Sequence, residues 1–193
     1  MGGTGTSGAS TAETAWRLVE AALRALHQAG DRPCLILHGP IASGKTQTAA
    51  HLARSLAEEG VSVGGILAPR IVKNGATAGY DVEDLGTGAR RALASLSPPG
   101  VVAGRYFLSR EGLDFARNAL FRALDDTEVV FVDEVGRLEL AGGGHAAAIR
   151  AALTRAILPV FVVRSSLVGE TLARFEIERA LALAIHSQEK SVR

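Results

Sequence analysis

The sequence has a single cysteine, Cys34, among 193 residues. One thiol excludes an intramolecular disulfide and a zinc cluster with several thiolates. Cys34 begins the apolar run 34–37, so we expect a buried strand residue rather than a reactive thiol. No stretch of about 18 apolar residues is present, and the N-terminus lacks the basic-then-apolar layout of a secretory signal. These absences predict a cytoplasmic protein without a membrane span.

The sequence also has no excess of charge of one sign. It contains 21 Lys and Arg and 20 Asp and Glu, a formal net charge of +1. A dedicated nucleic-acid binder carries a basic excess, so no direct nucleic-acid binding is expected. The five histidines show no metal-ligand spacing. Neither Asn74 nor Asn118 lies in an Asn-Lys-x-Asp segment, the usual guanine-reading motif, so base preference stays open. The sequence names no protein partner.

The N-terminal region differs in composition from the rest of the chain. Its first eleven residues are mostly Gly, Ser and Thr, and we predict that residues 1–13 are a disordered tail. Residues 14–32 are predicted to be a helical extension, because apolar residues recur at helical spacing from Trp16 to Leu26. Residues 33–193 are then assigned to one domain.

Short apolar runs alternate with helical patterns from residue 34 onward. Buried strands are predicted at four apolar runs: 34–38, 61–68, 129–132 and 159–163. Helices are predicted at four stretches of helical spacing: 47–59, 111–124, 146–156 and 167–175. Segment 176–185 partly fits both helix and strand. The alternation predicts an α/β protein with a mainly parallel sheet covered by helices on both faces.

A different pattern occupies residues 69–109. Asn74-Gly75 is a hairpin turn signal, the segment 79–85 alternates after it, and 101–108 offers another strand. No helix-length pattern lies within this region. We therefore predict a small antiparallel β insert that extends one edge of the sheet.

A phosphate-binding motif follows the first predicted strand. The residues are Gly39, Pro40, Ile41, Ala42, Ser43, Gly44, Lys45 and Thr46, which fit G-x-x-x-x-G-K-[ST] at every fixed position. Backbone N–H groups of such a loop and the start of the next helix surround phosphate oxygens, and Gln47 continues this contact. Lys45 would reach the β- and γ-phosphates, and the Thr46 hydroxyl would bind Mg²⁺. The motif predicts ATP, GTP or another nucleoside triphosphate as substrate and Mg²⁺ as cofactor.

An acidic pair ends the third predicted strand. Asp133 and Glu134 directly follow the apolar run 129–132. Open α/β sheets bind ligands at the carboxyl ends of their strands, so this pair is expected to face the nucleotide. Asp133 would hold Mg²⁺ directly or through water. Glu134 would orient and deprotonate an attacking water.

From this point the sequence resembles a known family. The segment 133–140, Asp-Glu-Val-Gly-Arg-Leu-Glu-Leu, closely resembles Asp-Glu-Ile-Gly-Lys-Met-Glu-Leu of small P-loop nucleoside triphosphatases, described in thermophiles and including the cancer-related nucleoside triphosphatase. Other agreeing segments are Val-Gly-Gly-Ile at 63–66, Gly-Tyr-Asp-Val-Glu-Asp-Leu at 79–85, Thr-Gly at 87–88 and Gly-Arg-Tyr at 104–106. The similarity extends from about Leu35 to Val163.

The resemblance implies a fold and an activity. It implies a RecA-like P-loop domain that hydrolyses nucleoside triphosphates to diphosphates with Mg²⁺ and tolerates different bases. Carried over residue by residue, it implies phosphate and metal roles for Gly44, Lys45, Thr46 and Asp133. It implies a catalytic role for Glu134.

The sequence departs from that family at several positions. Arg137 stands where the family has lysine, which keeps the charge, and Ala42 replaces a glycine common inside the family's loop. Arg70 follows Pro69 where the family usually has glutamate, and the segment 164–166 also differs.

A cation is needed to neutralise charge as the γ-phosphoryl group leaves. Arg137 lies three residues after Glu134, and Arg164 ends the strand that follows the one bearing Asp133. Both are therefore predicted as catalytic candidates. The other candidate arginines are Arg70, Arg105 and Arg110.

Three functions use this set of residues. A magnesium-dependent nucleoside triphosphatase is the first, and its catalytic residues would be Lys45, Glu134 and an arginine. A nucleotide or small-molecule kinase would use the same loop, although the segment 164–179 lacks an arginine-rich lid. A nucleotide-dependent switch with slow hydrolysis is the third. Tyr80, Tyr106 and Phe107 could stack a base, but packing within the insert is the favoured interpretation.

Overall fold

The computed structural model describes residues 17, 34–155 and 157–186. The predicted tail at 1–13 and, except for Arg17, the predicted extension at 14–32 lie outside this part. The strands are β1 (Cys34–Gly39), β2 (Val63–Leu67), β3 (Arg70–Lys73), β4 (Ala76–Asp84), β5 (Arg90–Ser95), β6 (Val101–Ala103), β7 (Tyr106–Leu108), β8 (Val129–Val135), β9 (Leu158–Arg164) and β10 (Ala180–Ala184). The helices are α2 (Lys45–Glu58), α3 (Arg110–Asp126), α4 (Arg137–Leu140), α5 (Ala146–Thr154) and α6 (Val168–Arg174), and a short 3-10 turn, η1, covers Ser165–Leu167.

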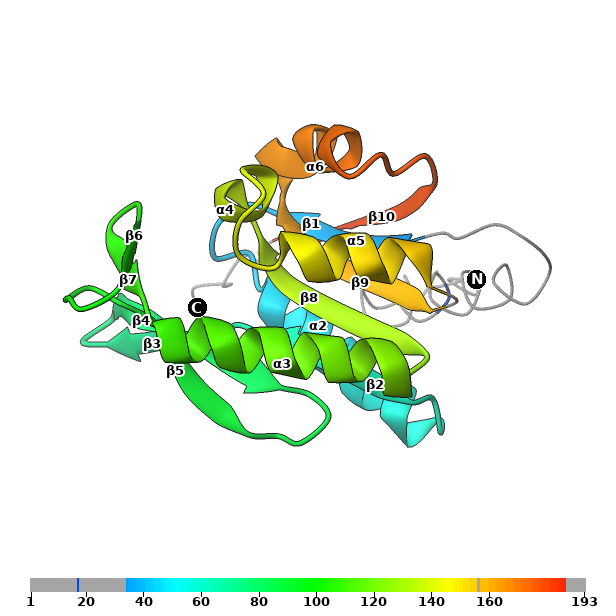
Figure 1. Cartoon of the computed structure of the whole chain (residues 1–193), viewed down its shortest axis with the longest axis horizontal. Helices are drawn as coiled ribbons and strands as arrows, with labels where there is room; N and C mark the ends of the chain where they lie inside the picture. The colour runs from blue at the N-terminus through cyan, green and yellow to red at the C-terminus, as the bar shows by residue number, and fades with distance from the viewer. Residues whose placement is uncertain (1–16, 18–33, 156, 187–193) are drawn as a thin grey trace, which may run out of the picture.

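All the strands form one ten-stranded sheet in the order β10-β1-β9-β8-β2-β4-β5-β7-β6, with β3 paired to β4. The strands from β10 to β2 are parallel, and every pairing beyond β2 is antiparallel. Figure 1 shows the antiparallel part projecting from one side of the parallel core. The predicted α/β fold with an antiparallel edge insert is therefore confirmed.

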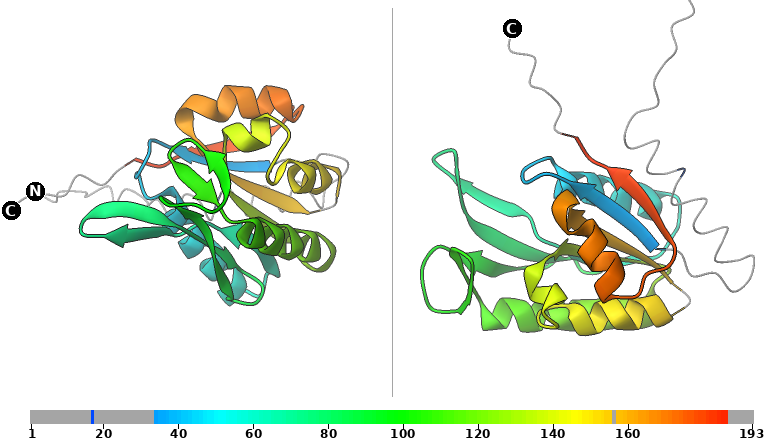
Figure 2. Two further views of the ribbon diagram at one scale, coloured as in Figure 1. Left: turned by 60° about the vertical axis from the view of Figure 1, so that its left-hand side comes forward. Right: turned by 90° about the horizontal axis from the view of Figure 1, so that it is seen from above.

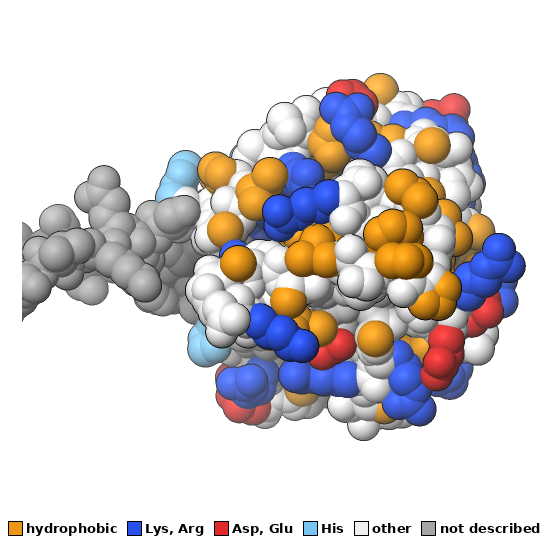
Figure 3. All heavy atoms as spheres, turned by 90° about the vertical axis from the view of Figure 1, so that its left-hand side faces the viewer, with side chains coloured by type: hydrophobic (Ala, Val, Ile, Leu, Met, Phe, Trp, Pro, Cys, Tyr) orange, Lys and Arg blue, Asp and Glu red, His pale blue; other side chains and the backbone are white. Residues whose placement is uncertain are grey.

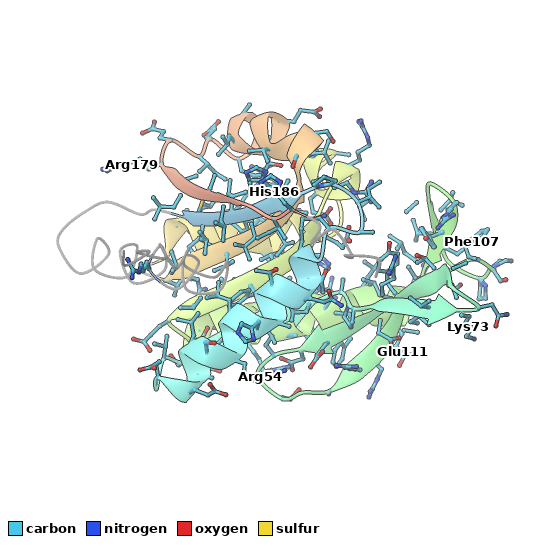
Figure 4. All side chains as sticks on the ribbon, turned by 180° about the vertical axis from the view of Figure 1, so that it is seen from behind. Arg54, Lys73, Phe107, Glu111, Arg179 and His186 are labelled. Carbon is cyan, nitrogen blue, oxygen red and sulfur yellow. The ribbon has the colours of Figure 1, made fainter. Side chains whose placement is uncertain are left out.

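Helices cover both faces of the parallel core. On β1, the side chains of Leu35 and Leu37 pack with α2, whereas Cys34 and Ile36 belong to the cluster that includes α3 and α5. This alternation follows from the two-residue period of a strand, and both faces are apolar because both are covered. Figure 1 shows α3 and α5 on the near face, and Figure 4 shows α2 on the opposite face.

Two adjacent glycines let β2 approach its neighbours closely. A Cβ at Gly64 would lie 2.7 Å from the Cβ of Ala123 on α3. Gly65 has a φ of +97°, and a Cβ there would lie 2.1 Å from the carbonyl oxygen of Phe131 on β8. The Val-Gly-Gly-Ile segment thus packs β2 against both the helix and the strand that carries the acidic pair.

The insert is more elaborate than the sequence predicted. The single strand predicted at 101–108 is wrong: β6 and β7 form a hairpin, and Gly104, with a φ of +61°, lies in the turn. Strand β5 was not predicted, because its exposed and buried residues give no clear alternation. The turn predicted at Asn74-Gly75 is confirmed, since both residues have left-handed φ values, +51° and +75°, as a tight hairpin requires.

The ambiguous segment 176–185 contains a strand. Strand β10 pairs in parallel with β1 and forms the edge of the sheet opposite the insert. Figure 2, seen from above, shows β10 beside β1 and opposite the insert. Within the described ranges, no helix combines the length and the apolar character needed to cross a membrane.

Candidate active site

The loop after β1 has the geometry of a phosphate nest. It leaves the strand at Gly39 and enters α2 at Lys45. A Cβ at Gly39 would lie 2.4 Å from the backbone carbonyl oxygen of Ile185, so the close approach of the two segments at this point requires glycine. Gly44 has a left-handed φ of +91°, and Ala42 adopts +62°. A left-handed alanine costs about 1–2 kcal/mol, so a glycine at position 42 would relieve backbone strain.

The lysine of the motif lies over the loop. Lys45 Nζ donates a hydrogen bond to the Pro40 carbonyl oxygen at 2.7 Å. Burial lowers the pKa of Lys45, while the negative charges of Glu134 and Asp133 act in the opposite direction. The ammonium group is therefore electrostatically coupled to the acidic pair, although β1, the strand before the loop, and β8 are not neighbours in the sheet.

Asp133 is the buried member of the acidic pair. Only 1% of the residue is exposed. Its Oδ2 accepts from the Ala68 N–H at 2.9 Å, and its Oδ1 accepts from the Glu134 N–H at 2.8 Å. Burial and the charge of Glu134 raise the pKa of Asp133 to about 6. The hydrogen bonds to its carboxylate, including one from the Thr46 side chain, act in the opposite direction and lower this pKa. A carboxylate and a hydroxyl side by side at a phosphate nest are a ligand set that fits Mg²⁺.

Glu134 is the exposed member and has an unusual backbone. Its φ is +55°, and the pairing of β8 with β9 shifts register between Val132 and Val135. This bulge directs the two carboxylates to different places, Asp133 into the protein and Glu134 toward solvent. Left-handed φ values at residues other than glycine cost about 1–3 kcal/mol and concentrate at functional sites. The strained residue is the one that the sequence assigned to catalysis.

Strand β9 separates the strand of the loop from the strand of the acids. Gly39 on β1 is opposite Arg164 on β9, and Val132 on β8 is opposite Phe161. Arg164 is thus the last residue of the central strand of the three. Its Nη2 lies 3.9 Å from the Glu134 Oε2, and its charge also lowers the pKa of Lys45. The sheet order therefore brings Arg164 to the middle of the site.

In the part of the chain that the structure describes, three other arginines predicted as candidates, Arg137, Arg70 and Arg105, make no hydrogen bond or ion pair with Glu134. Arg137 is exposed at the first position of α4, and its guanidinium makes no hydrogen bond or ion pair with the described residues. Arg70 contacts Thr77 at 3.4 Å, and Arg105 donates to the Tyr106 hydroxyl at 2.6 Å. In Figure 3, which views the molecule from the insert side, basic side chains are spread over this face among apolar ones. Of these cations, Arg164 is the one with a contact to Glu134.

Tyr80 is a residue of the insert whose hydroxyl is affected by the charge of Glu134. It lies on β4, half-buried, and its pKa is raised by burial first and then by the charge of Glu134. Tyr106 contacts it from β7, with ring centroids 5.4 Å apart and an interplanar angle of 80°. Phe107, the next residue, lies at the outer end of the insert (Figure 4). No local spacing could indicate the position of Tyr80, because it depends on the pairing order of the insert.

Glu139 fixes the loop that follows the acidic pair. Only 4% of Glu139 is exposed, and its carboxylate accepts from the N–H groups of Gly136 at 3.0 Å and His145 at 3.2 Å. Burial raises the pKa of this carboxyl group. Glu139 therefore has a structural role: it holds α4 against the loop that leads to α5.

His145, in the same loop, gives stability a pH dependence. Burial lowers its pKa from 6.5 to about 4, so the folded protein keeps it neutral where the unfolded chain takes up a proton. Neutral His145 therefore contributes to the free energy of unfolding in full above pH 6.5. This contribution is lost as the pH falls toward 4, and the loss amounts to about 3 kcal/mol. His145→Leu is expected to remove this component of the acid-side loss, measured by urea unfolding between pH 4 and 7. The exposed His51→Leu is the control and should keep the wild-type slope. Equal slopes in both variants would contradict the prediction.

These features define a P-loop nucleotide-binding protein with a RecA-like order of strands. The model of a family described as NTPase matches residues 34–190, so the chain belongs to the NTPase family. The nucleoside-triphosphatase THEP1 of Methanopyrus kandleri is 36% identical over 129 residues, which are 67% of this chain and 72% of that protein. THEP1 of Methanosarcina barkeri is 34% identical over 112 residues, 57% of this chain and 64% of that protein.

Two solved structures share the fold. The solution structure of a human cancer-related nucleoside triphosphatase aligns with a TM-score of 0.60 and 21% identity, over 82% of this chain and 90% of the other. The crystal structure of THEP1 from the hyperthermophile Aquifex aeolicus aligns with a TM-score of 0.63 and 17% identity, over 82% and 92%. The resemblance noted in the sequence and the RecA-like fold it implied are confirmed.

Proposed function

We propose that this chain is a magnesium-dependent nucleoside triphosphatase that hydrolyses a nucleoside triphosphate to the diphosphate and phosphate. The observation that carries the proposal is the convergence of Lys45, Asp133, Glu134 and Arg164 at the carboxyl edge of the parallel strands. Membership of the NTPase family and the names of the relatives support the same reaction.

Each residue has a role that its position supports. The nest at 39–46, continued by Gln47, binds the phosphates, and Lys45 adds a full positive charge to them. Thr46 and Asp133 would hold Mg²⁺, which supplies charge neutralisation and positioning when it is bound.

The general base and the cation lie beyond the nest. Glu134 is exposed and accepts the proton of the attacking water. Arg164 lies close to Glu134 and stabilises the charge that builds up on the γ-phosphoryl oxygens. Arg137, whose exposed guanidinium makes no hydrogen bond or ion pair with the described residues, is the second candidate for that role. No base-reading residue is assigned, so a broad base preference is proposed.

The test is phosphate release from ATP, GTP, CTP and UTP. Wild-type protein is expected to release phosphate with Mg²⁺ and to stop when EDTA removes the metal. Lys45→Ala is expected to weaken binding of the Mg²⁺–nucleotide complex about tenfold or more, because a charge on the phosphates is lost. Exposed Arg54 on α2 gives the control Arg54→Ala, which should bind normally.

A panel of nucleosides and nucleoside monophosphates added to the same assay distinguishes hydrolysis from kinase activity. Transfer of the γ-phosphoryl group to an acceptor, or no saturable nucleotide binding at all, would contradict the proposal. Binding without turnover would favour the switch.

A further inference from the structure

The carbonyl oxygen of Ile185 lacks the donor that the sheet would supply. Strands β1 and β10 are parallel, with His38 opposite Ala184, and the Ile185 N–H donates to the His38 carbonyl oxygen at 2.6 Å. In a parallel ladder every second residue exchanges both of its hydrogen bonds with the neighbouring strand, so residue 40 would be the next to donate, to Ile185. Residue 40 is proline, which has no N–H. Ile185 is 3% exposed, and no donor to its carbonyl oxygen is found among the described residues.

The hydroxyl of Ser43 lies near this carbonyl and also lacks a partner. Ser43 is 6% exposed, and its Oγ is a buried polar atom without a hydrogen bond in the part of the chain that the structure describes. A Cβ built on Gly39 would lie 2.4 Å from the Ser43 Oγ and 2.4 Å from the Ile185 carbonyl oxygen, so both oxygens approach the same side of Gly39. Buried polar groups are rarely left without a partner. Here an unpaired hydroxyl, which can donate, lies near an unpaired carbonyl oxygen, which can only accept.

The Pro40 carbonyl oxygen connects these two groups to phosphate binding. It accepts from the Lys45 Nζ at 2.7 Å and from the Ser43 N–H at 3.4 Å. When the nest holds phosphates, both donors are needed elsewhere: the ammonium group at the β- and γ-phosphates, and the N–H inside the nest. The Ser43 N–H then turns away from Pro40, and the Ser43 hydroxyl moves relative to the Ile185 carbonyl oxygen.

We propose that Ser43 is a positioning residue of the phosphate nest, whose hydroxyl donates to the Ile185 carbonyl oxygen when a nucleotide is bound. The proposal rests on the proposed function, because it concerns how the same loop holds the phosphates. The hydroxyl takes the place of the N–H that Pro40 lacks, and the bond fixes Ser43 with its own N–H directed into the nest. The chain at the end of β10 thereby supports the phosphate site.

Ser43→Ala is expected to weaken binding of Mg²⁺–ADP about three- to tenfold, because one neutral hydrogen bond of the bound loop is lost. Without nucleotide its Tm should equal or exceed that of the wild type, since the substitution removes a buried hydroxyl that has no partner. Calorimetric titration and thermal unfolding measure the two quantities. Ser55→Ala on α2 removes a hydroxyl outside the loop and is the control, with wild-type affinity expected. Unchanged affinity in Ser43→Ala, or a lower Tm, which indicates a structural role, would overturn the proposal.

Pro40→Ala offers a rescue that a structural role of Ser43 would not produce. Alanine restores an N–H at residue 40 that can donate to the Ile185 carbonyl oxygen, so the Ser43 hydroxyl becomes dispensable. In the Pro40→Ala background, Ser43→Ala should therefore change the affinity for Mg²⁺–ADP less than twofold. A loss of the same size in both backgrounds would overturn the proposal.

The Ile185 carbonyl can also be observed directly, without a change at Pro40. Ile185-His186 is the only Ile-His pair in the sequence, so ¹³C in the carbonyl of isoleucine and ¹⁵N in histidine give a single NMR cross-peak. A carbonyl that accepts a hydrogen bond has its ¹³C resonance shifted downfield. Addition of Mg²⁺–ADP should cause this shift in the wild type but not in Ser43→Ala, and shifts of the same size in both would overturn the proposal.

The two proposals fail in different ways. A wild-type protein without saturable binding of any nucleotide contradicts the proposed function itself. A wild-type protein that binds Mg²⁺–ADP, with a Ser43→Ala variant of the same affinity, contradicts only the role of Ser43.

Discussion

Glu134→Gln is expected to lower kcat for phosphate release about 10³-fold and to leave the affinity for the Mg²⁺–nucleotide complex within a few-fold of wild type. The amide has nearly the same size as the carboxylate, but it cannot accept a proton from water, and general-base catalysis contributes about 10²–10⁴-fold. Glu134 lies outside the nest at 39–46, so binding should persist. Steady-state kinetics and nucleotide titration measure the two quantities.

The exposed acid Glu111 on α3 provides the control. Glu111→Gln removes a surface carboxylate that lies 3.7 Å from Arg91, outside the site, and should hydrolyse at the wild-type rate. If Glu134→Gln keeps wild-type kcat, the water must be activated by another group, and the assignment of Glu134 is wrong.

Gly65→Ala is expected to destabilise the fold by about 4 kcal/mol or more, among the largest effects for a single substitution. The new Cβ would lie 2.1 Å from the Phe131 carbonyl oxygen and 2.7 Å from the Phe131 N, both backbone atoms of a central strand that cannot move aside. Thermal unfolding should show a Tm lower by about 10 °C.

Gly60→Ala separates this steric clash from backbone strain. Gly60 has a similar φ, +85° against +97°, but a Cβ there would meet nothing within 4 Å. Its cost should be limited to the left-handed conformation, about 1–2 kcal/mol. Equal losses in Tm for the two variants would mean that the close approach of β2 and β8 contributes nothing.

Local features of the sequence predicted the parts of the site that are local. The loop at 39–46 is contiguous, and the strand before it and the helix after it have clear hydrophobic periods. The acids 133 and 134 end an apolar run and were predicted for the same reason. The sequence did not predict that Glu134 would have a left-handed backbone, because a bulge depends on the register with β9.

The sequence could not show which residues the strand order of the sheet brings close to Glu134. Arg137 is close to Glu134 in the chain, yet the arginine beside Glu134 is Arg164, which follows Glu134 by 30 residues. The insert adjoins the acidic pair because β4 pairs with β2, a neighbour relation that no periodicity encodes. Strand β10 was ambiguous because Ala180–Ala184, with the letters ALALA, satisfies the helical and the extended pattern alike.

Because β9 lies between β1 and β8, it sets the distance between the phosphate-binding loop and the acidic pair. Neighbouring strands lie about 4.8 Å apart, so two strands with a third between them are roughly 10 Å apart at their ends. That spacing is set by the backbone of the sheet. Strand β9 also ends in Arg164. The strand that separates β1 from β8 therefore also places a positive charge between the phosphate-binding loop and the acidic pair.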